Sequence, residues 1–162
     1  MTDCMKISVV TPLFRTAAHV EELHARCAAA VRAAGATEYE IVFVNDGSPD
    51  ASLAEAKKAA ARDTNVVVVD LARNYGQHKA IMTGLAYATG DYVFVMDSDL
   101  EEAPEWIALF HRELTAKQCD VAYGISNLDR GLAYSLRRNA HTNAPTAGEC
   151  GRPRTVTKLT VR

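Results

Sequence analysis

Two carboxylates separated by one residue follow a strongly apolar segment. Asp97-Ser98-Asp99 stands directly after Asp91–Met96 (DYVFVM). Carboxylates two positions apart, just past a strand end, can converge on one hard cation, and Mg²⁺ or Mn²⁺ takes oxygen ligands. Such a cation often bridges one or two carboxylates to substrate phosphates and neutralises a diphosphate leaving group. A bare tripeptide of this kind is usually a solvated acidic turn, but its place after a buried-looking strand favours metal-assisted chemistry.

Two further polar clusters also follow apolar segments. Asp46 and Gly47 come after Glu40–Asn45 (EIVFVN), and the loop Arg73–Gln77 comes after Asn65–Asp70 (NVVVVD). The Asp46 carboxylate can accept a hydrogen bond from a nucleobase, and Gly47 lets backbone approach a ligand closely. The loop offers a cation, amides and a glycine before a helix N-terminus, which suits an anion or a ribose. Taken singly, the clusters also fit an ordinary turn and a solvated loop.

Strand-like and helix-like segments alternate along the chain, which predicts an α/β fold with a mostly parallel sheet and helices on both faces. Ligands of such sheets bind at the carboxyl ends of the strands, so the three polar clusters are expected to share one edge. Thr16 is the expected N-cap of the first helix. The expected strands are 6–13, 40–45, 65–70, 91–96 and 120–123, and the expected helices are 17–34, 52–62, a segment ending near 88, and 105–117.

Composition and missing motifs narrow the class of protein. The 162 residues suit one domain, and 48% hydrophobic with 23% charged residues is typical of a soluble globular protein. A net charge of -2 predicts no nucleic-acid partner. The chain has no GxxxxGK[ST], no GxGxxG after the first strand and no GxSxG. Four scattered cysteines, none in a CxxC pair, and an N-terminus without an apolar leader predict a cytoplasmic protein.

Four motifs occur in order: Val9–Phe14 (VVTPLF), Phe43–Ser52 (FVNDGSPDAS), Leu71–Gln77 (LARNYGQ) and Gly90–Leu100 (GDYVFVMDSDL). Four ordered motifs are far more specific than any one of them. Together they resemble the inverting family 2 glycosyltransferases of GT-A fold, especially the branch of dolichol-phosphate mannose synthases and related polyprenyl-phosphate glycosyltransferases. The resemblance covers about residues 6–125 and implies a Rossmann-like, nucleotide-binding GT-A half.

The resemblance implies a reaction and a role for each cluster. A sugar would pass, with inversion, from a UDP- or GDP-linked donor to an acceptor such as a polyprenyl phosphate, which would place the protein at the inner face of the membrane. Asp46 would hold the base, and Asp99 would ligate Mg²⁺ or Mn²⁺. The implied nucleotide-sugar-binding residues are Pro12, Leu13, Asp46, Gly47, Arg73, Asn74, Gly76, Gln77, Asp97 and Ser98, and the implied metal ligands are Asp99 and Asp97.

The last part of the chain differs from the rest in charge and pattern. Residues 1–129 hold 11 Lys/Arg against 19 Asp/Glu, whereas residues 130–162 hold 7 Lys/Arg against one acid, Glu149. The change in charge places a boundary near residue 129 and predicts a basic, weakly structured tail at 130–162. For residues 1–129 the resemblance implies a GT-A nucleotide-sugar-binding domain with an incomplete acceptor side. Family members carry the catalytic base and a flexible lid on the acceptor side, and nothing in the tail matches that region. The base is therefore unassigned. A C-terminal truncation is the first interpretation, and the alternatives are a shifted reading frame or a genuine basic tail.

Two functions stay open from the sequence: an inverting glycosyltransferase, or a catalytically incomplete module that binds the nucleotide sugar without turnover. A nucleotidyltransferase is disfavoured because Pro12–Thr16 has no glycine after the first strand. Three stretches depart from the family pattern, and one of them is Asn45-Asp46, which stands before Gly47 in place of two aspartates. Arg15-Thr16 stands where many members have an acid, and Glu101–Pro104 (EEAP) stands where the polyprenyl branch usually has Gln-Asp-Pro-Pro. A sheet that stops near residue 125 would expose apolar surface, which predicts self-association.

Overall fold

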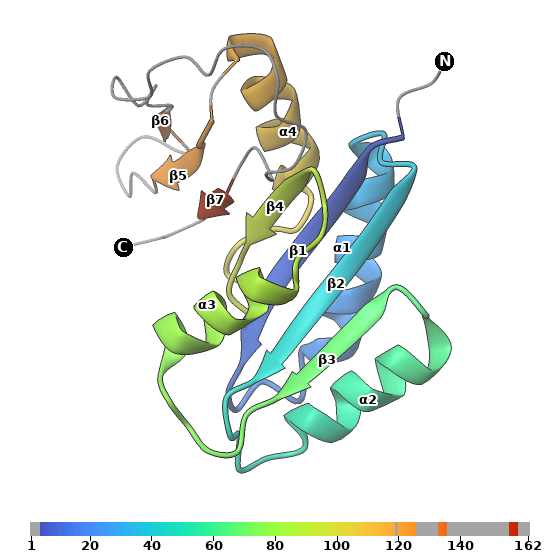
Figure 1. Ribbon diagram of the computed structural model, residues 1–162, viewed down its shortest axis with the longest axis vertical. Helices are drawn as coiled ribbons and strands as arrows, with labels where there is room; N and C mark the ends of the chain where they lie inside the picture. The colour runs from blue at the N-terminus through green and yellow to red at the C-terminus, as the bar shows by residue number, and fades with distance from the viewer. Residues whose placement is uncertain (1–3, 119, 126–132, 136–155, 159–162) are drawn as a thin grey trace.

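The computed structural model describes residues 4–118, 120–125, 133–135 and 156–158. Four strands with intervening helices make up the main body (Figure 1). Its elements are β1 (Lys6–Leu13), α1 (Val20–Ala33), β2 (Glu38–Asn45), α2 (Ser52–Arg62), β3 (Val66–Asp70), α3 (Gln77–Tyr87), β4 (Tyr92–Val95) and α4 (Trp106–Lys117). Three short strands follow: β5 (Tyr123–Ile125), β6 (Ala133–Ser135) and β7 (Val156–Lys158).

The main sheet has the strand order β3-β2-β1-β4-β7, and each neighbouring pair is parallel. The chain steps outward from β1 to β2 and β3, and then returns to place β4 on the other side of β1. The strand order therefore reverses between β1 and β4. Such a reversal leaves a crevice outside the carboxyl ends of the two strands, which is where open α/β sheets bind ligands. The topology thus predicts a site beyond Leu13 and Val95.

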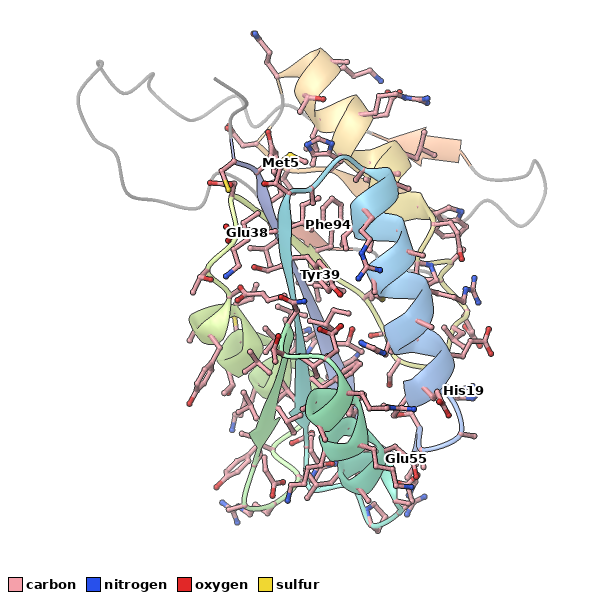
Figure 2. All side chains as sticks on the ribbon, turned by 90° about the vertical axis from the view of Figure 1, so that its right-hand side faces the viewer. Met5, His19, Glu38, Tyr39, Glu55 and Phe94 are labelled. Carbon is pink, nitrogen blue, oxygen red and sulfur yellow. The ribbon has the colours of Figure 1, made fainter. Side chains whose placement is uncertain are left out.

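Helices cover both faces of this sheet. The helices α1, α2 and α4 pack on one face and α3 packs on the other (Figure 1), and the view turned by 90° separates the two layers (Figure 2). Successive residues of a strand point to opposite faces. Val9 therefore joins the core on the α1 side, whereas Val10 joins the smaller cluster beside α3. This arrangement confirms the predicted α/β fold with a mostly parallel sheet.

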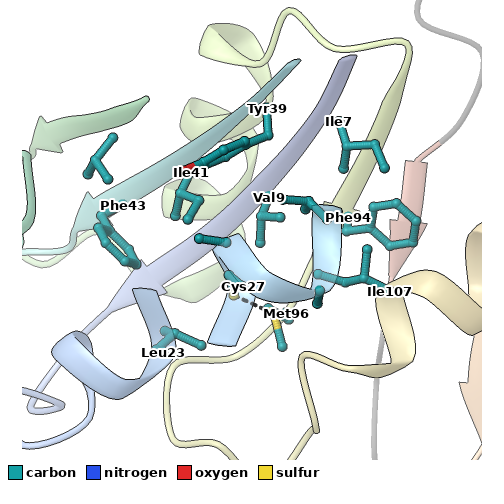
Figure 3. Packing of buried hydrophobic residues seen from close by; sticks show 14 of the residues in the cluster. Ile7, Val9, Leu23, Cys27, Tyr39, Ile41, Phe43, Phe94, Met96 and Ile107 are labelled. Atoms are coloured by element: carbon teal, nitrogen blue, oxygen red, sulfur yellow. Dashed lines mark hydrogen bonds between the residues drawn. The ribbon is translucent and has the colours of Figure 1, made fainter. Parts of the chain in front are cut away.

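The larger core cluster fills the space between the sheet, α1 and α4 (Figure 3). Phe43 and Phe94 are fully buried in it. Cys27 lies in the same layer, with its Sγ 3.6 Å from Sδ of Met96. Burial raises the pKa of the Cys27 thiol to about 12. The side chain is therefore a protonated packing group and not a nucleophile at neutral pH.

The largest differences from the predicted bounds are at the start of α1 and at the fifth strand. Helix α1 begins at Val20 and its N-cap position is His19, so the predicted N-cap at Thr16 is wrong. The backbone amide of Thr16 donates to Oγ of Ser52 at 3.0 Å, which keeps this residue in the loop between β1 and α1. The fifth strand lies later than the predicted 120–123, at Tyr123–Ile125, and pairs antiparallel with β6 outside the main sheet.

Within the predicted tail at 130–162, the structure describes only the backbone of β6 and β7. The strand β7 lies in a short alternating stretch, Thr155–Val161, and pairs parallel with β4. The other residues of this tail lie outside the described part of the chain. The division into a domain at 1–129 and a tail therefore stays a prediction.

Thr11 carries a buried hydroxyl for which the described residues provide no hydrogen-bond partner. The side chain is 0% exposed, so its Oγ1 has lost water without replacing it. We expect Thr11→Val to raise the free energy of unfolding by about 1 kcal/mol, because valine has the same shape without the polar atom. Urea unfolding measures this. The control Thr11→Ser keeps the hydroxyl and removes a methyl group, and it should destabilise the protein. An equal loss of stability in both variants would contradict the explanation.

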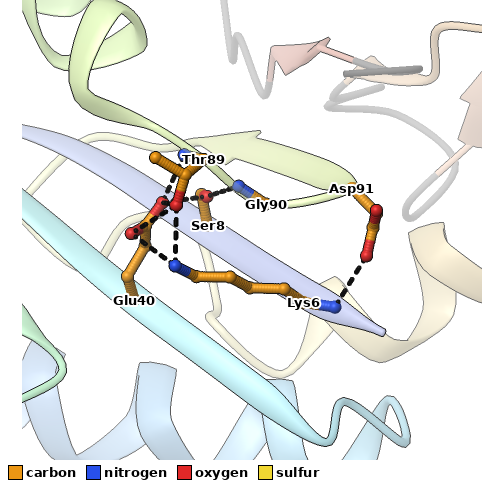
Figure 4. A network of polar contacts seen from close by, with 6 residues as sticks. All are labelled: Lys6, Ser8, Glu40, Thr89, Gly90 and Asp91. Atoms are coloured by element: carbon orange, nitrogen blue, oxygen red, sulfur yellow. Dashed lines mark hydrogen bonds and ion pairs between the residues drawn. The ribbon is translucent and has the colours of Figure 1, made fainter. Parts of the chain in front are cut away.

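A buried polar network joins the starts of β1 and β2 to the turn before β4 (Figure 4). Glu40 is 7% exposed and accepts from the Ser8 hydroxyl, from the Thr89 amide and hydroxyl, and from Lys6, whose Nζ lies 3.0 Å from Oε2. The Gly90 amide donates to Ser8 Oγ at 2.8 Å. Burial raises the pKa of Glu40, but the hydrogen bonds from Ser8, Thr89 and Lys6 outweigh burial, and the net pKa is lowered.

This lowered pKa of Glu40 predicts a loss of stability in acid. The folded protein binds the proton less tightly than the unfolded chain does. The contribution of Glu40 is therefore complete above the unfolded pKa of about 4.3, and it is lost as pH falls through the folded pKa. Glu40→Gln should lower the free energy of unfolding at neutral pH by about 2 kcal/mol and should reduce its dependence on pH below about pH 4.3. Urea unfolding across this range tests it, and an unchanged acid dependence in the variant would be the contrary result.

Candidate functional site

A pocket of about 350 Å³ lies at the carboxyl edge of the main sheet. Every one of the first four strands contributes to it through the loop that follows. Its lining residues are Pro12 near the end of β1 and Phe14 and Thr16 after it, Asp46 after β2, Asn74, Gly76 and Gln77 after β3, and Asp97, Ser98 and Asp99 after β4. The pocket thus occupies the place that the strand order predicts, and it brings the three polar clusters of the sequence together.

Asp50 fixes the two loops on one side of the pocket. Its carboxylate accepts from the Ser48 hydroxyl at 2.6 Å, from the Ser52 amide at 3.0 Å and from the Ala17 amide at 3.1 Å. Burial raises the pKa of Asp50, but the hydrogen bonds from Ser48, Ser52 and Ala17 outweigh it and hold the pKa far below its usual range. The carboxylate is therefore charged at neutral pH, and it ties the β1–α1 loop to the turn before α2.

Asp46 is almost completely buried, with 1% exposure, although it lines the pocket. Its Oδ1 accepts from the Tyr75 amide at 2.7 Å, and its Oδ2 accepts from the Gly76 amide at 2.9 Å. A carboxylate has about four acceptor positions, so two such bonds leave capacity for a ligand. The structure therefore gives Asp46 a role that the sequence did not predict, which is to hold the loop Arg73–Gln77. Its predicted contact with a base stays a prediction.

Gly47 packs directly against the backbone of this loop. Its φ of +60° lies in the left-handed region, and a Cβ at this position would be 2.4 Å from the Asn74 nitrogen and 2.5 Å from the Arg73 carbonyl carbon. The sequence predicted that a ligand would approach the backbone of Gly47 closely. In the structure, the backbone of Arg73 and Asn74 makes this close approach. Gly47 is not among the residues that line the pocket.

Two other predicted residues also lie outside the lining. Leu13 is 0% exposed and belongs to the larger core cluster. The guanidinium of Arg73 lies over the ring of Tyr75, 4.9 Å from its centroid, on the exposed side of the loop. The structure thus brings together Pro12, Asp46, Asn74, Gly76, Gln77, Asp97, Ser98 and Asp99 of the predicted set.

Side chains from different loops orient Asp97. Nε2 of Gln77 donates to Oδ1 of Asp97 at 2.5 Å, and the backbone amide of Asp97 donates to Oε2 of Glu102 at 3.4 Å. Glu102 is 2% exposed, so this acid of the unusual Glu-Glu-Ala-Pro stretch lies inside the protein, behind the Asp97-Ser98-Asp99 tripeptide. The one signal for Glu102 in the sequence was the departure of this stretch from the family pattern.

The other two residues of the tripeptide differ in exposure. Ser98 is buried, and its hydroxyl donates to Oγ1 of Thr16 at 3.1 Å. Asp99 is exposed, and its Oδ1 accepts from the Glu101 amide at 3.1 Å. Leu100 adopts a φ of +63°, which is uncommon for a residue with a side chain and turns the backbone sharply after Asp99. The tripeptide is therefore held by its neighbours, with the Asp99 carboxylate on the solvent side.

The sequence did not single out Phe14 and Thr16 as binding residues, although both line the pocket. Phe14 is 41% exposed, which is unusual for a large apolar side chain and indicates a surface available to a flat ligand. Their position in the sequence could have identified them, because both residues closely follow β1, one of the two strands between which the strand order reverses.

The carboxylates suit a hard divalent cation bound together with a phosphate ligand. Among the described residues there is no group of three or more His, Cys, Asp or Glu side chains that could hold a metal ion. The carboxylates of Asp97 and Asp99 are the ligands that this part of the chain would supply. Mg²⁺ binds through one or two carboxylates, with waters and substrate phosphates completing its shell. The donor set fits that form of site and does not fit a closed metal cage.

Relatives and solved structures point to one family. The chain is 43% identical over 140 residues to the undecaprenyl-phosphate 4-deoxy-4-formamido-L-arabinose transferase of Sodalis glossinidius, covering 86% of the chain and 42% of that relative. A crystal structure of S. aureus TarS in complex with UDP-GlcNAc has a TM-score of 0.62 and 27% identity, covering 80% of the chain and 37% of TarS. The mannosyltransferase PcManGT from Pyrobaculum calidifontis, in complex with GDP-Man and Mn²⁺, has a TM-score of 0.60, 22% identity and similar coverage, and it supports the fold.

The chain spans 30–42% of the length of the curated relatives that it matches. Within the described residues, none of the helices is long and apolar enough to cross a membrane. The family model for glycosyl transferase family 2 matches residues 8–151, which is most of the chain and extends past the last of the four motifs. This chain belongs to glycosyl transferase family 2.

Proposed function

We propose that the chain forms the donor-binding part of a glycosyltransferase that moves a sugar from a UDP- or GDP-linked donor to an acceptor, with inversion. The observation that carries this proposal is the pocket itself. It gathers an exposed aromatic side chain, a buried carboxylate and two further carboxylates at the point where the strand order reverses. An aromatic face with a hydrogen-bond acceptor suits a nucleoside, and the paired carboxylates suit a metal-bound diphosphate.

We propose a position in this pocket for each part of the donor. The base and ribose would lie against Pro12 and Phe14, with Asp46 as an acceptor for a base N–H. The diphosphate would lie between the N-terminus of α3, which begins at Gln77, and the carboxylates of Asp97 and Asp99. A helix N-terminus favours an anion. A divalent cation on the carboxylates would neutralise the charge that develops on the diphosphate as it leaves.

The acceptor side is proposed from the relatives. The Sodalis relative is named for transfer to undecaprenyl phosphate, so we propose a polyprenyl phosphate as the acceptor and the inner membrane surface as the place of reaction. The domain would comprise residues 1–129, followed by a basic tail at 130–162 whose charge suits an anionic lipid surface. Of the known structures, PcManGT contains Mn²⁺ with its GDP-sugar, which supports Mn²⁺ or Mg²⁺ as the cofactor.

Calorimetry with UDP and GDP, each with and without Mn²⁺, tests the donor site, and a transfer assay with the corresponding sugar nucleotide tests turnover. Binding of one nucleotide that strengthens when Mn²⁺ is added supports the proposal. Metal-dependent binding without turnover supports the alternative, in which this chain is a nucleotide-sugar-binding module that is catalytically incomplete. If neither nucleotide binds with Mn²⁺ present, the proposed function is wrong.

A further inference from the structure

Hydrogen bonds join the four loops around the pocket into a closed circuit. The β1–α1 loop contacts the segment after β2 through Thr16 and Ser52, and that segment contacts the β3–α3 loop through Asp46. The β3–α3 loop contacts the tripeptide after β4 through Gln77, and the tripeptide returns to the β1–α1 loop through Ser98. A displacement of one loop is therefore passed to its neighbours through specific donors and acceptors.

Gln77 holds a special place in this circuit. It is the first residue of α3, and its side chain is exposed while its Nε2 reaches Oδ1 of Asp97. The preceding residue, Gly76, donates its amide to Asp46 on the base side of the pocket. Two adjacent residues thus connect the carboxylate of the metal side to the carboxylate of the base side. The Tyr75 amide adds a second bond to Asp46.

We propose that Gln77 is a positioning residue that couples the metal side of the pocket to the nucleotide-binding loop Arg73–Gln77, so that cation and nucleotide each raise the affinity for the other. This inference rests on the proposed function. A cation that binds Asp97 changes the charge on the acceptor to which Gln77 donates. The start of α3 and the loop before it must adjust to this change, because Gly76 and Tyr75 are fixed to Asp46.

The coupling has to be reciprocal, since both ligands bias the same arrangement of the loop. Direct contact between the cation and a diphosphate would also couple the two ligands, and that contact does not depend on Gln77. The contribution of Gln77 is therefore separated by a measurement in which no phosphate is present. Addition of the cation alone should then change the NMR signals of the loop amides of Tyr75 and Gly76.

The test is an NMR titration of the isotope-labelled chain with Mg²⁺ alone, followed by calorimetry with UDP or GDP with and without Mg²⁺. In the parent chain, Mg²⁺ alone should shift the amide signals of Tyr75 and Gly76. Gln77→Met keeps the length of the side chain and its helix propensity but removes the N–H donor. These shifts should vanish in the variant, and the gain in nucleotide affinity caused by Mg²⁺ should fall by about fivefold.

Met82→Ala is the matched control, because Met82 lies on the same helix, is 66% exposed and is not among the lining residues. It should reproduce the parent in both measurements. If Mg²⁺ and nucleotide bind the parent but Gln77→Met leaves the shifts and the affinity gain unchanged, the inference is wrong while the donor site stands. If neither ligand binds the parent, the proposed function and this inference are both wrong.

Discussion

Asp99→Asn is expected to lower the Mn²⁺-dependent gain in UDP or GDP affinity on the order of 10- to 100-fold. The variant keeps the size of the side chain but replaces a charged ligand by a neutral amide, and groups that merely orient metal ligands already cost this much when they are removed. Asp99 is the exposed carboxylate of the pocket, and the bond it accepts from the Glu101 amide involves Oδ1. Nucleotide affinity without metal should change little, because Asp99 would act through the cation.

The matched control for this variant is Glu38→Gln, which also converts one exposed carboxylate to an amide. Glu38 starts β2 at the end of the sheet opposite the pocket (Figure 2). Its substitution changes the net charge by the same amount, so it reports any general effect of charge on nucleotide binding. Equal loss of the Mn²⁺-dependent gain in both variants, or full retention of it in Asp99→Asn, would remove Asp99 from the metal site.

Gly47→Ala should displace the loop Arg73–Gln77 and weaken nucleotide binding about tenfold or more, while lowering the free energy of unfolding by at least about 2 kcal/mol. Two effects add at this position. A side chain at φ +60° costs roughly 1 kcal/mol, and the new Cβ would meet the Asn74 nitrogen at 2.4 Å. Backbone atoms cannot rotate away as a flexible side chain would, so the loop itself has to move.

Gly35→Ala separates these two effects. Gly35 also has a positive φ, +86°, but a Cβ there meets nothing within 4 Å. It should therefore show only the backbone cost, about 1 kcal/mol in urea unfolding, with unchanged nucleotide affinity. A Gly47→Ala variant that matches Gly35→Ala in both stability and binding would mean that the loop does not depend on this contact.

The sequence predicted the sheet well because the information is local and repeated. Strands such as Lys6–Leu13 are nearly continuous runs of apolar residues, and amphipathic helices separate them. This pattern determines a parallel sheet covered on both faces. The predicted edge also followed, because parallel strands joined by helices all bring their carboxyl ends to one side. The polar clusters at Asp46, Arg73–Gln77 and Asp97 were therefore placed at one edge correctly from topology alone.

The details that the sequence missed depend on contacts between distant segments. Thr16 has the residue type of an N-cap, but its amide binds Ser52 and its hydroxyl accepts from Ser98, so the helix starts later. Asp46 has the residue type of a ligand-binding acid, but it also holds two loop amides 29 and 30 residues away in sequence. No periodicity or local propensity encodes such bonds, since they exist only after the strands have paired.

Leu13 is a residue for which the sequence predicted a binding role that the structure does not support. It belongs to a motif that resembles a nucleotide-binding strand end, yet its side chain points into the core while its neighbours Pro12 and Phe14 line the pocket. Side chains alternate along a strand, so adjacent residues of one motif must have different surroundings. A motif therefore identifies the strand end. The alternation of side chains along the strand then determines which residues of the motif can contact a ligand.

We propose that the carboxyl edge of this sheet holds a metal-bound nucleoside diphosphate. Crystals grown with Mn²⁺ and UDP or GDP, measured at a wavelength where manganese scatters anomalously, locate the cation directly. We expect one anomalous peak roughly 2.1 Å from a carboxylate oxygen of Asp99, with the diphosphate beside it and the base near Phe14 and Asp46. A nucleotide bound with its diphosphate away from Asp97 and Asp99, or a manganese peak elsewhere on the chain, would contradict it.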